Sequence, residues 1–170
     1  SISIYAFHPM YIDLRKLPKL KDKESLERYE KERKVLNELS QVCYEKVNHY
    51  KRSYLRDLFN QEGREMLSSD KFKEFFNNNE EWLVPYAAFS YLRDKYNTPQ
   101  FRSWPEYSSF NLEEIKELCS DTGEAYTDIS FYYFMQFILH EQLLEASNYA
   151  REKGIILKGD IPIGISRNSV

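Results

Sequence analysis

The feature that most constrains the fold is a long segment, residues 124–153, whose centre is apolar on nearly every side. From Ile129 to Leu139 the sequence reads "ISFYYFMQFIL". A helix with this pattern has no face to offer to solvent, so it must be buried on most sides. Lys153 and Gly154 follow, and glycine is the usual residue just past a helix end. The sequence therefore predicts a long, buried helix over 124–153.

A second helical region is predicted over residues 19–62, which contain neither Gly nor Pro. Its apolar side chains recur at steps of three, four or seven, as on one face of a helix. Periodicity alone does not place a break, so one long helix and two shorter ones both remain open. We expect Gly63 to end the region.

Further helices follow from capping and breaking residues. Ser69 is a good N-cap for the helical sequence "DKFKEFF", and the "NNN" run at 77–79 predicts a stop. Residues 80–96 predict a further helix, which Pro85 either kinks or begins. Asn111 predicts the start of a short helix with two glutamates in its first turn, where the helix dipole favours anions.

The run "KGIILKGDIPIGI" at residues 153–165 differs from the rest of the chain. Its core, Ile155–Ile161, predicts a strand that is apolar on both faces, as in buried parallel sheets. A parallel sheet needs several strands and this chain offers one, so we expect the chain to be cut from a longer protein. Residues 1–14 predict an extended or irregular segment, because Pro9 interrupts any ladder.

Composition excludes several classes of function. A net charge of −3 gives no basic face for a nucleic acid, and no apolar run approaches a membrane span. Cys43 and Cys119 match no metal spacing and predict free thiols of a reducing, cytoplasmic compartment. His8, His49 and His140 share no ligand spacing either. We therefore expect no metal, no cofactor, no nucleic-acid partner and no membrane partner.

A few residues are candidates for a binding site. Asp160 follows the predicted strand, and the carboxyl ends of barrel strands face the active site; the alternative is that it caps the next turn. Aromatic residues are frequent over 72–107, and most fall at helical spacing, which favours a core. Trp104 and Tyr107 lie in a loop instead, so they are candidates for stacking on a sugar ring.

Several motifs together resemble one family. The run "YAREKGIILKGDIPIGISRNSV" is similar to "Y-A-x-x-x-G-I-x-x-x-G-D-[IL]-P-I", followed by a loop "S-x-D-x-W", in the 4-α-glucanotransferases (amylomaltases or disproportionating enzymes). "SISIYAFHPMYIDL", "FFNNNEEWLVPYAAFSYLRDKY" and "SWPEY" resemble further segments in the same order. "FMQFILHEQL" resembles "Q-[FY]-x-x-x-x-Q-W", with Leu143 where Trp is usual. The pair His8-Pro9 resembles the larger disproportionating enzymes.

The resemblance implies a (β/α)8 TIM barrel of the α-amylase superfamily with a large helical insertion. The chain would be a mainly α fragment of it. Residues 1–18 would be an early barrel-loop segment, 19–153 the helical insertion subdomain, and 154–170 a barrel strand with the start of the following loop.

The resemblance also implies retaining transfer of α-1,4-glucan segments between maltooligosaccharides or glycans. The family's nucleophile, acid and third acidic residue lie on later strands, so this chain would hold no catalytic residue and be inactive alone. An α-1,4-glucan is the expected partner. Asp160, Trp104 and Asn168, which lies in the loop after the strand, are the expected substrate-binding residues.

The alternative function is a self-standing helical interaction module whose final strand docks on the sheet edge of a partner. In either case an unpaired strand at 153–165 exposes its edges and recruits other chains. We expect it to pair with a second copy, to pair with residues 1–7, or to be poorly ordered. A reading frame that continues past Val170 into acidic strand-end motifs would favour the enzyme.

Overall fold

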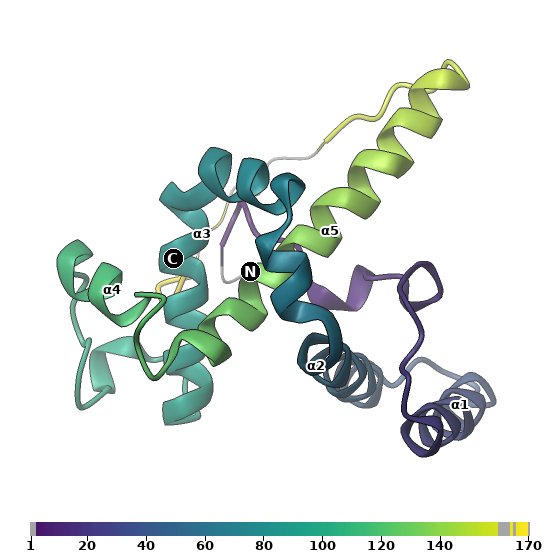
Figure 1. Ribbon diagram of the computed structural model, residues 1–170, viewed down its shortest axis with the longest axis horizontal. Coiled ribbons are helices and arrows are strands. Elements are labelled where there is room, and N and C mark those ends of the chain that lie inside the picture. Colours follow the sequence, from purple (N-terminus) through teal and green to yellow (C-terminus); the bar gives the residue numbers. More distant parts are fainter. Residues whose placement is uncertain (1–2, 160–163, 165, 170) are drawn as a thin grey trace.

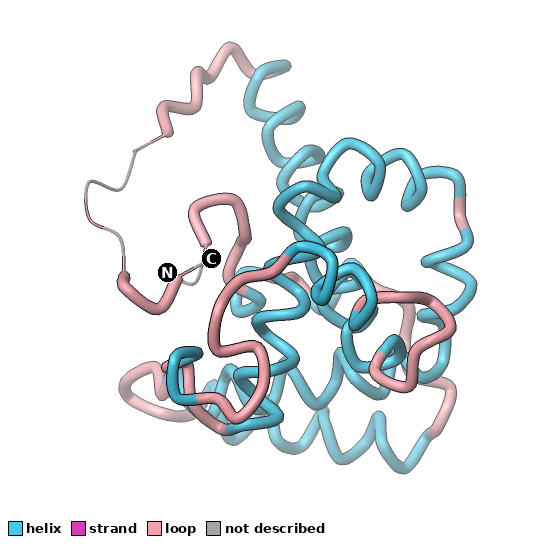
Figure 2. Tube along the Cα trace, turned by 90° about the vertical axis from the view of Figure 1, so that its left-hand side faces the viewer, coloured by secondary structure: helices cyan, strands magenta, loops and turns pink. Residues whose placement is uncertain are grey.

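The computed structural model describes residues 3–159, 164 and 166–169, and these form a helical assembly (Figures 1 and 2). The mainly α prediction is confirmed. The α-helices of this part are α1 (Lys23–Asn37), α2 (Tyr44–Ser68), α3 (Asp70–Tyr96), α4 (Leu112–Leu118) and α5 (Tyr126–Glu152). Short 3-10 turns lie at η1 (Pro9–Tyr11), η2 (Leu14–Lys16) and η3 (Phe101–Ser103). Among these described helices, none is long and apolar enough to cross a membrane.

Helix α5 is the centre of the fold, as its apolar run predicts. Every residue from Ile129 to Leu139 is buried, and both α2 and α3 pack against this stretch. Phe59 of α2 meets Phe134 edge-on with ring centroids 5.3 Å apart, and Phe72 of α3 meets Phe137 in the same way at 5.5 Å. Gly154 follows with a positive φ of 72°, a conformation that ends helices and suits glycine.

The helical stripe over residues 19–62 is two helices, α1 and α2, joined by a short turn. Asp22 caps α1, because its Oδ2 accepts a hydrogen bond from the Ser25 amide at 2.8 Å. Tyr29 then fixes α1 against α2, where its ring meets Tyr54 edge-on at 5.2 Å and its hydroxyl donates to Asp57 at 2.8 Å.

The two predicted helix ends at Gly63 and at 77–79 are wrong. Helix α2 continues to Ser68 and α3 continues through the asparagines. Gly63 is tolerated because the ring of Phe59 covers it: a Cβ at this position would lie 2.3 Å from Phe59 Cδ2. The asparagines are tolerated because Asn79 donates to the Phe75 carbonyl at 2.7 Å and accepts from Trp82 Nε1 at 2.9 Å.

The capping predictions on either side of α3 are confirmed. Ser69 accepts the Phe72 amide at 3.2 Å at the start of α3, and Asn111 accepts the Glu113 amide at 3.0 Å at the start of α4. Pro85 lies well inside α3, where it removes one amide from the hydrogen-bond ladder. Figure 1 shows α3 changing direction along its length, in agreement with the predicted kink.

The barrel strand predicted over Ile155–Ile161 is absent from the described part of the chain. Residues 155–159 form an irregular, exposed segment after α5, and Ile156 is 91% exposed. Residues 160–163 lie outside the described residues. The physical reason for the difference is that a strand needs a neighbour to satisfy its backbone groups, and residues 3–159 offer none. Figure 1 shows the end of α5 projecting away from the other helices.

Candidate functional site

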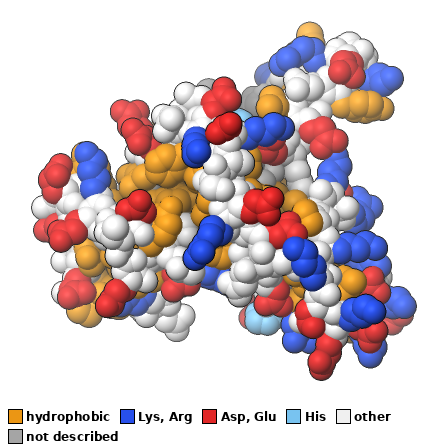
Figure 3. Space-filling model, viewed as in Figure 1, with side chains coloured by type: hydrophobic (Ala, Val, Ile, Leu, Met, Phe, Trp, Pro, Cys, Tyr) orange, Lys and Arg blue, Asp and Glu red, His pale blue; other side chains and the backbone are white. Residues whose placement is uncertain are grey.

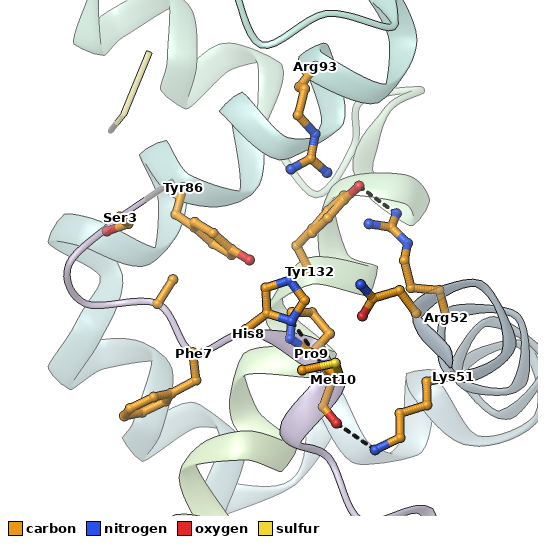
Figure 4. Close-up of a pocket in the computed structure, with 12 residues that line it drawn as sticks. Ser3, Phe7, His8, Pro9, Met10, Lys51, Arg52, Tyr86, Arg93 and Tyr132 are labelled. Atoms are coloured by element: carbon orange, nitrogen blue, oxygen red, sulfur yellow. Dashed lines mark hydrogen bonds between the residues drawn. The ribbon is translucent and has the colours of Figure 1, made fainter. Parts of the chain in front are cut away.

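A polar cavity of about 420 Å³ lies where the N-terminal segment meets α2, α3 and α5 (Figure 4). The N-terminal segment forms one wall, and side chains from the three helices form the others. The lining residues are Ser3, Ala6, Phe7, His8, Pro9, Met10, Asn48, Lys51, Arg52, Tyr86, Arg93 and Tyr132. This cavity is the candidate functional site, because it gathers cationic and hydrogen-bonding groups from four separate elements.

Two glutamines of α5 hold the N-terminal wall in place. Gln136 Oε1 accepts the Phe7 amide at 3.0 Å, and Gln136 Nε2 donates to the Phe7 carbonyl at 2.9 Å. Gln142 makes the same pair of bonds with the backbone of Asp13, at 2.8 and 3.0 Å. Each side-chain amide thus pairs with the backbone as a neighbouring strand would. These are the two glutamines of the motif in "FMQFILHEQL", and their role is to fix the chain on either side of His8.

His8 stands between these two anchors and lines the cavity. Its Nδ1 accepts the Met10 amide at 3.2 Å. Burial, with the positive charges of Arg52 and Arg93, lowers the pKa of His8 below its ordinary value of 6.5. The imidazole is therefore neutral at neutral pH.

Asp94, at the end of α3, joins the cationic side of the cavity. Its Oδ2 accepts from Arg52 Nη2 at 2.7 Å and from the Tyr132 hydroxyl, and its Oδ1 accepts from Arg93 Nη2 at 2.7 Å. Burial alone would raise the pKa of Asp94, but the hydrogen bond from Tyr132 and the charges of the two arginines lower it below its usual value. Burial, chiefly, raises the pKa of Tyr132 to about 12. Asp94 is therefore ionised and Tyr132 neutral at pH 7.

Lys51 is held differently. Its Nζ donates to the carbonyls of Met10 and Ile12 at 2.5 and 2.8 Å, so it ties α2 to the N-terminal segment. Burial lowers the pKa of Lys51 from its ordinary value. In the part of the chain that the structure describes, no carboxylate forms an ion pair with it.

The arrangement of cationic and hydrogen-bonding groups suits the binding of a ligand. Retaining glycoside chemistry needs two carboxyl groups about 5 Å apart, one of them protonated. The described lining residues include no Asp or Glu, and the adjacent Asp94 is ionised. Residues 3–159, 164 and 166–169 also contain no cluster of His, Cys, Asp or Glu that could hold a metal ion.

A second, apolar cavity of about 420 Å³ lies between α3, η3 and α4, on the face where Figure 3 shows apolar side chains gathered over α3. Trp104 lines it but is only 5% exposed, because its ring packs on Phe89 at 5.4 Å and its Nε1 donates to the Thr98 carbonyl at 2.9 Å. Tyr107 also lines this cavity and has a positive φ of 59°. The structure therefore gives Trp104 a packing role, and its part in sugar binding stays a prediction.

Asn168, another predicted site residue, is not among the described residues that line the polar cavity. Asn168 lies in a turn, where its amide donates to Ser166 Oγ at 3.2 Å. Asp160 lies outside the described residues. Sequence reasoning missed Arg52, Arg93 and Asp94, because no local motif shows that α2 and α3 bring them together. The paired glutamines of "FMQFILHEQL" were the one available signal.

Comparison with known proteins supplies the family. The family described as 4-alpha-glucanotransferase, glycoside hydrolase family 77, matches residues 1–170. The chain is 39% identical over 170 residues to 4-alpha-glucanotransferase DPE2 of Oryza sativa subsp. japonica, covering all of this chain and 18% of the relative. It is 30% identical over 170 residues to the 4-alpha-glucanotransferase of Chlamydia muridarum, covering 99% of this chain and 32% of the relative. No solved structure matches.

The chain belongs to the 4-alpha-glucanotransferase family, as its motifs predicted. It spans less than a fifth of the length of the rice relative and about a third of the chlamydial one. A short chain that matches a portion of longer relatives is consistent with the predicted fragment.

Proposed function

We propose that this chain is the helical part of a 4-α-glucanotransferase that moves α-1,4-glucan segments between maltooligosaccharides or glycans. The observation that carries the proposal is the family match along all 170 residues.

The reaction would be a retaining double displacement. A carboxylate attacks the anomeric carbon, a second carboxyl group protonates the departing sugar, and the glycosyl-enzyme then passes to the 4-hydroxyl of another glucan. Under this proposal the two carboxyl groups come from the longer protein, and this chain lines the substrate site. Asp160, Trp104 and Asn168 are its proposed sugar-binding residues.

A cytoplasmic location is part of the same proposal. Cys43 and Cys119 are both free thiols, in keeping with a reducing compartment. Burial raises the pKa of Cys119 to about 11, so its thiol stays protonated and unreactive.

The proposal is tested by glucose release from maltotriose. The longer protein that contains this chain should disproportionate maltotriose, and the 170-residue chain alone should release no glucose above a buffer blank. In the longer protein, Asp160→Asn should lower kcat strongly without changing the fold, because an amide orients a sugar hydroxyl or a neighbouring cation poorly. The control is Asp121→Asn, an exposed turn residue. Glucose release by the isolated chain, or full activity of Asp160→Asn, would contradict these assignments.

An interaction module is the second candidate, and one observation favours it. The segment after α5 exposes three apolar side chains by more than half: Ile155, Ile156 and Leu157. Such exposure is expected of a segment that binds another protein. A crosslinking side chain placed at position 158 distinguishes the two proposed functions. A glucanotransferase should crosslink this segment to its own barrel, and a module should crosslink it to another protein.

A further inference from the structure

The polar cavity carries more positive than negative charge. Lys51, Arg52 and Arg93 all line it, and the carboxylate that bonds to the two arginines is Asp94. Burial keeps the pKa of Tyr132 near 12, so its hydroxyl adds no negative charge at pH 7. The lining thus holds three cations, and one carboxylate, Asp94, pairs with two of them.

The other acidic group near Lys51 does not offset this excess. Asp13 lies close enough to influence the pKa of Lys51, but both of its carboxylate oxygens are taken by Arg15. The Arg15 Nε and Nη2 atoms donate to them at 2.9 and 2.7 Å. The charge of Asp13 is thus already matched by a cation of its own.

The cavity also holds donors that its own ion pairs leave available. A guanidinium has five N–H groups in a planar fork, and Arg93 uses its Nε and Nη2 on Asp94. Figure 4 shows the Arg93 guanidinium, the Tyr86 hydroxyl and the His8 imidazole pointing into the same space, the first two from α3 and the third from the N-terminal segment. Arg93 is only 20% exposed, which strengthens its attraction for an anion.

We propose that this cavity binds a phosphate group, as free phosphate or as the phosphate monoester of a sugar. The arginine fork matches the oxygens of a phosphate, whose dianion would balance the two excess charges. A volume of about 420 Å³ lies within the range of small-molecule sites and leaves room for an attached sugar. A neutral glucan would leave the excess charge unmatched. The proposal goes beyond glucan transfer and rests on the charges of the cavity alone.

The test is calorimetric titration of the 170-residue chain at low ionic strength, with inorganic phosphate, glucose 6-phosphate and maltose in turn. We expect saturable one-to-one binding of both phosphates and none of maltose. Tighter binding of glucose 6-phosphate would identify a sugar phosphate as the ligand, and equal binding would identify free phosphate. Absence of saturable phosphate binding would overturn the proposal. It would leave glucan transfer untouched, because glucose release measures that separately.

Variants locate the bound phosphate. Arg93→Gln should weaken phosphate binding about tenfold or more, as loss of a charge-assisted hydrogen bond does. Arg64→Gln is the matched control, because it removes the same charge from an exposed position on α2. Arg64 lines neither of the two cavities described above. Equal affinity of Arg93→Gln and the unchanged chain, or equal loss in Arg64→Gln, would overturn the site.

A second variant guards against misfolding of the first. Arg93→Lys keeps the positive charge but loses the planar fork, so it should fold normally and bind phosphate several-fold less tightly. The melting temperature of each variant is measured beside its affinity. Unchanged phosphate affinity in a folded Arg93→Lys would also overturn the proposal.

Discussion

Gln136 shows how one side chain can define a site without entering it. It is 1% exposed, and its amide bonds to both backbone groups of Phe7 and to the Tyr86 hydroxyl at 3.2 Å. One residue of α5 therefore positions the N-terminal wall of the cavity and a tyrosine of α3 together. A buried amide in an otherwise apolar helix is tolerated because its hydrogen bonds are satisfied.

We predict that Gln136→Leu lowers the free energy of unfolding by about 1–3 kcal/mol, because it leaves the backbone groups of Phe7 without their partner. The amide proton of Phe7 should lose its protection from hydrogen exchange, while that of Phe134 should keep it. Urea unfolding and exchange measured by NMR check the two effects. Gln41→Leu, in the exposed turn before α2, is the control. Unchanged protection at Phe7 would show that the amide pair does not hold this segment.

At the scale of elements, the sequence predicts helix starts better than helix ends. Ser69 and Asn111 cap their helices through local hydrogen bonds, which the neighbouring residues already imply. Gly63 and Asn79 looked like breaks, but a glycine costs only about 1 kcal/mol in a helix. Burial against α5 outweighs that cost for α2. Asn79 satisfies its side chain within α3, through Phe75 and Trp82.

The polar cavity was beyond sequence reasoning for a related reason. Its residues come from the N-terminal segment, α2, α3 and α5 and are far apart in the chain, so only tertiary packing unites them. The family motifs did predict the family, because they cover the whole chain. The prediction of a strand was wrong for residues 155–159, because a strand needs a neighbouring strand and residues 3–159 provide none.

Asp94 lies where α2, α3 and α5 meet, and its ion pairs predict that the stability of the fold depends on pH. The pKa of Asp94 is lowered from its ordinary value of 3.8 in the folded chain, so folding favours the ionised form. The stabilisation is therefore complete above pH 3.8 and is lost as the pH falls through the lowered folded value. We expect Asp94→Asn to be less stable than the unchanged chain at pH 7, with the difference shrinking toward pH 3.

Urea unfolding at a series of pH values measures this difference. Asp121→Asn is the control, because Asp121 is exposed in the turn before α5 and should give a small difference with little pH dependence. A stability gap for Asp94→Asn that is constant between pH 7 and pH 3 would show that the three helices do not depend on this charge.

At the scale of the whole molecule, the end of α5 and the segment after it form an apolar projection. Leu143, Leu144 and Tyr149 are exposed along the last turns of α5, and Ile155–Leu157 are exposed just beyond it. Exposed apolar side chains gathered on one projection are typical of a surface that contacts another body. Under the proposed function that body is the rest of the longer protein, and in the isolated chain a second copy can take its place.

We therefore predict that the isolated 170-residue chain self-associates through residues 155–157. Light scattering over a concentration series should show a rising mean mass, and Ile156→Lys should suppress it, because a charge at the most exposed of these positions opposes burial. Val35→Lys is the matched control, since Val35 is 60% exposed on α1, away from the projection, and should leave the association unchanged. A chain that stays monomeric over the whole series would show that this segment does not need a partner. Equal suppression by both lysines would mean that net charge, and not this segment, governs the association.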